Sequence, residues 1–311
     1  MKITYRTPAK VILSGEHAVV YGKPALICGL GIYATVTVAD AERKQFPHPA
    51  CEYIENAVLA YLKKHKISYT DRPYQVTADV QIPISRGLGS SAALSVCMSA
   101  ALLEFLTGTE FEKEQINAVA YAAEKQFHGN PSGADNSTCC YGGLVFYRKE
   151  FEFLKTLSVL HGKLPEPIER RLYLIDSGAP RESTKDMVRL VGKRYNADPS
   201  ETDAILARIE KATKRMVVSI IKEDIELFRS CIEDNHYALE SLGVVSSSCK
   251  KLLNSLSDYG VGKITGAGGN TKGSGFILFY CDDPNELEKK LTSLSVPWFN
   301  IQQDYQGVTR I

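Results

Sequence analysis

The sequence lacks the charge excess and the long apolar segments that mark nucleic-acid binders and membrane proteins. Its 37 Lys and Arg residues are balanced by 36 Asp and Glu residues, which gives a net charge of +1. This near-neutral charge disfavours binding of nucleic acid by bulk electrostatics but does not exclude a local basic cleft. The N-terminus has no apolar signal segment. The low-charge stretch 24–39 is broken by glycines and is shorter than the roughly 20 residues that span a bilayer. We therefore expect a cytoplasmic protein without a membrane partner.

Clustered metal ligands and the two commonest phosphate motifs are also missing. None of the eight cysteines forms a C-x-x-C pair and the six histidines are widely separated, which argues against a structural zinc site. The cysteines are expected to be reduced and mostly buried. There is no G-x-x-x-x-G-K-[ST] motif and no G-x-G-x-x-G that opens a helix. Neither a P-loop enzyme nor a Rossmann dehydrogenase is supported.

Hydrophobic patterns divide the chain into strands and helices. Residues 73–85 alternate between apolar and polar side chains, which is typical of a half-buried strand. Other strands are predicted within 3–38 and at 142–147, 171–176 and 276–279. Helical patterns cover 52–64, 92–106, 114–127, 202–235 and 285–294. The irregular alternation, with a proline-containing boundary at 162–171, predicts an α+β fold of two domains, 1–165 and 166–311.

The turn between the predicted strand 73–85 and the following helix has the composition of a phosphate-binding loop. It consists of Gly87, Leu88, Gly89, Ser90, Ser91 and Ala92. Glycines let a backbone approach an anion closely, and the start of a helix presents unpaired N–H groups with a partial positive charge. The serine hydroxyls add hydrogen-bond donors or a ligand for Mg²⁺. A serine cap on a core helix is the alternative, and this turn alone does not decide between them.

A second glycine-rich loop lies near the end of the chain. Five glycines fall within the ten residues 266–275, immediately before an apolar strand. Such a density requires an unusual backbone, and it favours a turn that closely contacts a ligand over a long hairpin loop.

Five ionisable residues gain meaning only in combination. Lys10 precedes an apolar strand segment, and Glu16 and His17 follow a glycine turn. Glu124 projects beside the apolar stripe of its helix, where a carboxylate is costly unless it is paired or bound to a metal ion. Asp135 lies in a loop just past that helix. Taken singly, these are more simply a solvated lysine, a surface pair, a helix-edge glutamate and a turn aspartate.

Three ordered motifs together resemble the GHMP kinases, the family of galactokinase, homoserine kinase, mevalonate kinase and phosphomevalonate kinase. They are Pro-x-Lys-Val-x-Leu-x-Gly-Glu-His at 8–17, Pro-x-x-x-Gly-Leu-Gly-Ser-Ser-Ala at 83–92 and Thr-Gly-Ala-Gly-Gly at 265–269. The resemblance covers nearly the whole chain. Within the family, segments 15–22 and 128–136 are most similar to the members that phosphorylate mevalonate.

The resemblance implies a role for each catalytic group. Asp135 is expected to be the general base for the substrate hydroxyl, with Lys10 beside it to stabilise the alkoxide and the transferred phosphoryl group. Ser91 (or Ser90) and Glu124 are expected to hold Mg²⁺. The amides of 87–92 are expected to wrap the triphosphate of ATP.

The resemblance also implies the substrate and its pocket. The expected reaction is ATP-dependent phosphorylation of the 5-hydroxyl of mevalonate, in the synthesis of isoprenoid precursors. Glu16, His17, Thr184 and Gly268 are expected to contact the acceptor. The alternatives are another acceptor, such as phosphomevalonate or homoserine, and a non-catalytic ligand-binding member of the fold.

The implied fold pairs an N-terminal domain like domain 2 of ribosomal protein S5 with a ferredoxin-like C-terminal domain. The active site is expected in the cleft between them, and a homodimer is possible in this family. The chain departs from the family pattern in two places. Ala9 replaces the usual glycine before Lys10, and 270–272 (Asn-Thr-Lys) interrupts the glycines of the third motif.

Overall fold

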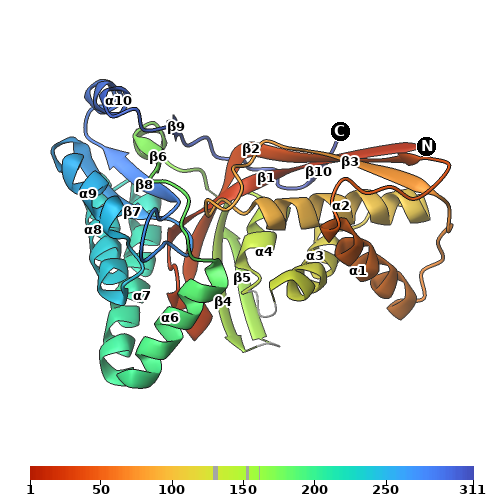
Figure 1. Ribbon diagram of the computed structural model, residues 1–311, viewed down its shortest axis with the longest axis horizontal. Helices are drawn as coiled ribbons and strands as arrows, with labels where there is room; N and C mark the ends of the chain where they lie inside the picture. Colours follow the sequence, from red (N-terminus) through yellow and green to blue (C-terminus); the bar gives the residue numbers. More distant parts are fainter. Residues whose placement is uncertain (129–131, 152–153, 161) are drawn as a thin grey trace.

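The structure is a computed structural model that describes residues 1–128, 132–151, 154–160 and 162–311. In this part of the chain two antiparallel sheets are each packed against helices, with the second sheet at the left of the view (Figure 1). The strand order is β10-β1-β2-β4-β5 in the first sheet, with β3 also paired to β2, and β7-β8-β6-β9 in the second. The predicted α+β class is confirmed.

The first sheet is built on the long hairpin of β1 and β2. Its strands are β1 (Lys2–Ser14), β2 (Ala25–Asp40), β3 (Tyr74–Val80), β4 (Leu144–Phe151), β5 (Leu154–Leu160) and β10 (Thr309–Arg310). The β1–β2 register shifts between Pro8 and Ala9, because proline has no N–H to give to a ladder. This irregularity lies directly before Lys10.

Helices cover one face of the first sheet, and the second half combines a smaller sheet with long helices. The helices of the first half are α1 (Ala50–Lys64), α2 (Ser90–Thr107), α3 (Lys113–His128) and α4 (Ala134–Tyr141). The second sheet contains β6 (Leu172–Asp176), β7 (Gly260–Ile264), β8 (Phe276–Cys281) and β9 (Trp298–Asn300). Its helices are α5 (Glu166–Glu169), α6 (Thr184–Ala197), α7 (Pro199–Lys222), α8 (Ile225–Leu242), α9 (Ser247–Ser255) and α10 (Pro284–Ser293). The short 3-10 turns are η1 (Ala18–Tyr21) and η2 (Ser257–Tyr259).

Helix α2 forms the centre of the first half. Glycines in the left-handed region stand at both of its ends, Gly89 with φ 77° and Gly108 with φ 75°. Among the described residues, α2 is the one helix long and apolar enough to cross a membrane, but 78% of that stretch is buried inside the protein. It is therefore a helix of the protein core, and its N-terminus directly follows the glycine–serine turn.

Three local predictions differ from the structure. The predicted strand 73–85 ends at Val80, since Pro83 cannot donate to a ladder and Ser85 takes a positive φ. The predicted helix 202–235 is two helices, broken where Glu223 adopts the left-handed conformation and Asp224 caps α8. Asp135 is in the first turn of α4, not in a loop, and part of the expected loop (129–131) lies outside the described residues.

One hydrophobic cluster extends through both halves, and two further buried clusters lie beside it. Buried residues of the first sheet, such as Val11, belong to the same cluster as Ile168 of α5 and Leu174 of β6. The last strand, β10, returns to pair with β1, so both ends of the chain lie in the right-hand half of the view (Figure 1). The division into domains 1–165 and 166–311 stays a prediction.

Candidate active site

Lys10 and Asp135, which are 125 positions apart in the sequence, meet in an ion pair. The distance from Lys10 Nζ to Asp135 Oδ1 is 3.0 Å. The lysine side chain is only 2% exposed, whereas that of Asp135 is 45% exposed. Asp135 stands in the first turn of α4, where the partial positive charge of the helix N-terminus favours a carboxylate. The pair thus joins a buried cation to a carboxylate that a second molecule can reach.

The glycine–serine turn is hydrogen-bonded to the strand that carries Lys10. The N–H of Lys10 donates to the carbonyl oxygen of Leu88 at 3.0 Å. Gly89 adopts φ 77°, and a Cβ atom there would lie 2.9 Å from Cγ of Lys10. Glycine is required for both reasons. The lysine side chain therefore runs along the turn that leads into the N-terminus of α2.

The third motif packs directly against this turn. A Cβ atom at Gly87 would lie 2.6 Å from the carbonyl oxygen of Thr265, and one at Gly266 would lie 3.0 Å from Cα of Gly87. Further along, a Cβ atom at Gly275 would lie 2.8 Å from the carbonyl oxygen of Arg86. The glycines of the two motifs thus allow their backbones to touch, which brings the three predicted motifs to one place.

Glu124 is joined to the glycine–serine turn (87–92) and to α2 through the hydroxyl groups of two serines. Its Oε1 accepts hydrogen bonds of 2.8 Å from Ser91 and from Ser95, both on α2. Glu124 is 5% exposed. One carboxylate and neighbouring hydroxyls are hard oxygen donors of the kind that Mg²⁺ takes together with substrate phosphates. In the described part of the chain no group of three or more His, Cys, Asp or Glu side chains is placed to hold a metal ion.

The thiol of Cys139, on α4, is buried. Burial raises the pKa of Cys139 well above its usual value, the charges of Asp135 and Glu124 raise it further, and the charge of Lys10 lowers it. All eight cysteines are buried and none is in a disulfide, as the sequence predicts.

His17 contacts the third motif. Its Nε2 lies 3.0 Å from the carbonyl oxygen of Ala267, between Gly266 and Gly268. The residue has φ 58°, and burial lowers the pKa of its imidazole. Gly268 is buried too, and a Cβ atom there would lie 2.1 Å from the carbonyl oxygen of Val244. His17 and this glycine loop form one wall beside the turn 87–92.

Glu16 has a different environment from the one expected. Its side chain is fully buried and forms an ion pair with Lys263, which is also fully buried. Asn235 of α8 donates to its second oxygen at 3.2 Å. Burial lowers the pKa of Lys263, and the charge of Glu16 opposes that shift. Glu16 is therefore the buried partner of Lys263, and its contact with an acceptor stays a prediction.

Thr184 begins α6, whose N-terminus is closed by a capping box between Ser183 and Asp186. The residue is exposed. The preceding Glu182 accepts hydrogen bonds from the amides of Asn270 and Thr271, at 3.3 and 3.1 Å. These bonds tie the segment of Thr184 to the atypical part of the third motif. They do not join Thr184 to Lys10 or Asp135.

Sequence reasoning did not single out Lys263 or Tyr147, and it named Thr265 only as the first residue of the third motif. Lys263 and Thr265 bond to the backbone of β1, and Tyr147 donates to the carbonyl oxygen of Ser132, just before α4. A single lysine in the otherwise apolar run 260–264 was the available signal for Lys263. Tyr147 gave no signal, because tyrosine is ordinary in strands.

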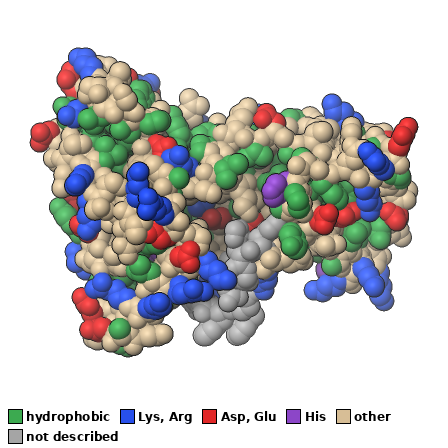
Figure 2. Space-filling view, viewed as in Figure 1, with side chains coloured by type: hydrophobic (Ala, Val, Ile, Leu, Met, Phe, Trp, Pro, Cys, Tyr) green, Lys and Arg blue, Asp and Glu red, His purple; other side chains and the backbone are tan. Residues whose placement is uncertain are grey.

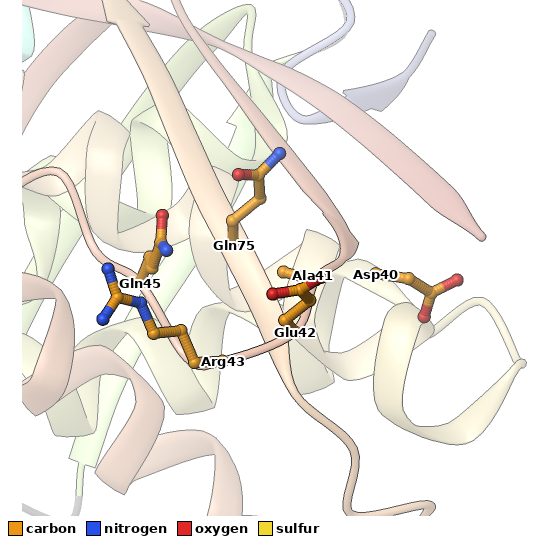
Figure 3. Close-up of a pocket in the computed structure, with 6 residues that line it drawn as sticks. All are labelled: Asp40, Ala41, Glu42, Arg43, Gln45 and Gln75. Atoms are coloured by element: carbon orange, nitrogen blue, oxygen red, sulfur yellow. The ribbon is translucent and has the colours of Figure 1, made fainter.

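The surface is recessed where the left and right parts of the molecule meet (Figure 2). Asp and Glu side chains are visible in the recess, and Lys and Arg side chains follow its lower left edge. A separate hollow of about 530 Å³ lies beside β3 and is lined by Asp40, Ala41, Glu42, Arg43, Gln45 and Gln75 (Figure 3). There Asp40 and Arg43 point in opposite directions (Figure 3).

The chain is similar to known kinases along nearly its whole length. The family description "GHMP kinases N terminal domain" matches residues 52–143. A mevalonate kinase of Pyrococcus furiosus is 30% identical, over 95% of this chain and 93% of that protein. Two solved structures show the same fold: a Methanococcus jannaschii mevalonate kinase (24% identity, TM-score 0.78, 98% of each chain) and an L. major mevalonate kinase in complex with R-mevalonate (22%, 0.74, 96% and 95%).

Proposed function

The chain belongs to the GHMP kinase family, and from this premise we propose that it transfers the γ-phosphoryl group of ATP to the 5-hydroxyl of mevalonate. The products are 5-phosphomevalonate and ADP. The single observation that carries the proposal is the Lys10–Asp135 ion pair of 3.0 Å beside the glycine–serine turn. The similarity to mevalonate kinases along 95% of the chain supports this choice of acceptor.

In the proposed mechanism, Asp135 accepts the proton of the acceptor hydroxyl as its oxygen attacks the γ-phosphorus atom. The bond from that phosphorus to the bridging oxygen of ADP breaks. Lys10 holds the Asp135 carboxylate in place and neutralises charge on the attacking oxygen and the transferred group. Its burial strengthens that interaction, because little water competes for the ammonium group.

The turn 87–92 and the start of α2 are proposed to hold the triphosphate. Their backbone amides and the helix N-terminus favour an anion. Ser91 and Glu124 would hold Mg²⁺, which when bound neutralises charge on the β- and γ-phosphates. His17, the loop around Gly268 and the segment of Thr184 are proposed to bound the acceptor pocket. Glu16 is proposed to stabilise this pocket through its buried ion pair with Lys263.

The test is a coupled ADP-release assay with mevalonate, phosphomevalonate and homoserine as acceptors. The expected result is the highest kcat/KM with mevalonate, and loss of turnover when Mg²⁺ is chelated. Preference for another acceptor would reassign the substrate within the family. Absence of turnover with every acceptor would support a non-catalytic, ligand-binding protein instead.

A cytoplasmic location, a role in isoprenoid precursor synthesis and a homodimer remain part of the proposal.

A further inference from the structure

The outer edge of β1 is filled by loops of the site in place of a strand. In the described part of the chain, β10 pairs with this edge at Tyr5 and Arg6. Beyond them, the N–H of Lys10 bonds Leu88, and the N–H of Ile12 donates to Thr265 Oγ1 at 3.0 Å. Backbone groups at such an edge need partners when they are buried. Here the glycine–serine turn (87–92) and the third motif supply these hydrogen-bond partners.

All three N–H donors of the Lys263 ammonium group have hydrogen-bond acceptors near this edge. An ammonium group has three donors. Those of Lys263 go to the carbonyl oxygens of Ile12, at 3.2 Å, and Ile264, at 3.0 Å, and to the carboxylate of Glu16. Thr265 directly follows β7 and also donates to the carbonyl oxygen of Ile12, at 3.2 Å. Lys263 of β7 and Thr265 just after it therefore hold the peptide groups of Ile12, two residues after Lys10.

The same cluster fixes the end of β1 to the helices of the second half. Asn235 of α8 donates to Glu16 and also to Ser14 Oγ, at 3.1 Å. Ser14 in turn shares a hydrogen bond of 2.7 Å with Thr213 of α7. The contact of α7 with β1 can be followed in Figure 1. A fully paired buried charge of this kind holds one geometry, because any shift leaves a charged group without a partner.

We propose that Lys263, with Glu16, is a positioning residue for phosphoryl transfer: it locks the edge of β1 so that the Lys10 ammonium group faces Asp135 while the third motif faces the phosphate-binding turn. Lys263 touches neither substrate nor the reacting atoms in this assignment. It acts through Lys10 and Ile12. The inference rests on the proposed function, and it adds a residue that the GHMP-type motifs did not single out.

The test compares Glu16→Leu/Lys263→Met, which removes both charges at similar volume, with wild type. Replacing a buried ion pair by apolar groups often leaves stability intact. We expect a midpoint of thermal unfolding close to wild type, kcat lower by about 10- to 100-fold, and KM for ATP within about threefold. The matched control is Lys44→Met/Glu55→Gln, which removes an ion pair of 2.8 Å near the other end of the first sheet and should leave kcat unchanged.

A stable double variant with kcat within twofold of wild type would overturn the proposal. If that variant does not fold, Thr265→Val decides by the same kinetic criteria, since it removes only the hydroxyl that bonds Ile12. Hydrogen exchange of a peptide covering 8–16 gives a readout that needs no turnover. Faster exchange in the variants is expected, and unchanged exchange contradicts the clamp. Wild-type protein that phosphorylates no mevalonate refutes the proposed function alone, and the exchange result then decides the role of Lys263.

Discussion

At the scale of residues, the site depends on a contrast between two neighbouring side chains. Lys10 is almost completely buried, and Asp135 is nearly half exposed. A buried cation is a strong electrostatic partner, and an exposed carboxylate can meet a substrate proton. In the proposed mechanism, this difference in environment separates the lysine that stabilises charge from the aspartate that accepts a proton.

Replacement of the base gives the first residue-scale prediction. Asp135→Asn keeps the shape of the side chain but cannot accept the hydroxyl proton, so kcat should fall by about 10³-fold. Binding of a non-hydrolysable ATP analogue, measured by calorimetry, should change by less than about threefold.

The matched control for this change is Asp79→Asn, an exposed carboxylate on β3. It should retain wild-type kcat. Turnover of the Asp135→Asn protein near the wild-type rate would remove Asp135 from the role of general base.

At the scale of elements, α2 gives the site both its position and its charge. Its N-terminus follows a turn whose two glycines have positive φ, and its body is buried in the core. Ser91, one of the two serines that donate to Glu124, stands in its first turn. A rigid core helix can therefore present amides, a hydroxyl and a partial positive charge at one point.

The two ends of α2 offer a matched pair of substitutions. Gly89 and Gly108 have nearly the same positive φ, but a Cβ atom at Gly89 meets Lys10 whereas one at Gly108 meets nothing within 4 Å. Each alanine substitution should cost about 1–2 kcal/mol of unfolding free energy from backbone strain. Gly89→Ala should in addition raise KM for ATP at least about tenfold. Equal kinetic effects of the two substitutions would contradict the assignment of the turn.

At the scale of the whole molecule, one core extends through both sheets. Met216 and Phe228, from α7 and α8, belong to the same buried cluster as Ile3 of β1. The terminal strand β10 pairs with β1 near the start of β1. The polar cluster of Lys263 joins the two halves near the other end of β1. The two halves are thus coupled by apolar and polar contacts.

This coupling predicts a single cooperative unfolding transition. The single tryptophan, Trp298, lies in β9 of the second sheet, so its fluorescence reports on that half alone. Far-ultraviolet circular dichroism reports on helices of both halves. The two signals should give the same midpoint in urea within experimental error. Midpoints that differ would show that domains 1–165 and 166–311 unfold independently.

The sequence by itself determined the elements and the chemistry of the motifs. Apolar periodicity is local, so it located α1, α2 and α3, and the glycine turns marked where a backbone must approach something closely. The order of the three motifs was enough to indicate the family. Local pattern failed where backbone conformation changes at one residue, as at Glu223, or where a proline ends a strand, as at Pro83.

Only the tertiary structure decided which side chains meet. The Lys10–Asp135 pair, the contact of Gly87 with Thr265 and the burial of Glu16 against Lys263 all join residues more than 100 positions apart. Such contacts follow from the packing of two sheets, which no local spacing encodes. The same packing gave Glu16 a buried cation as its partner and left Asp135 open to solvent, since burial belongs to the folded chain and not to a residue type.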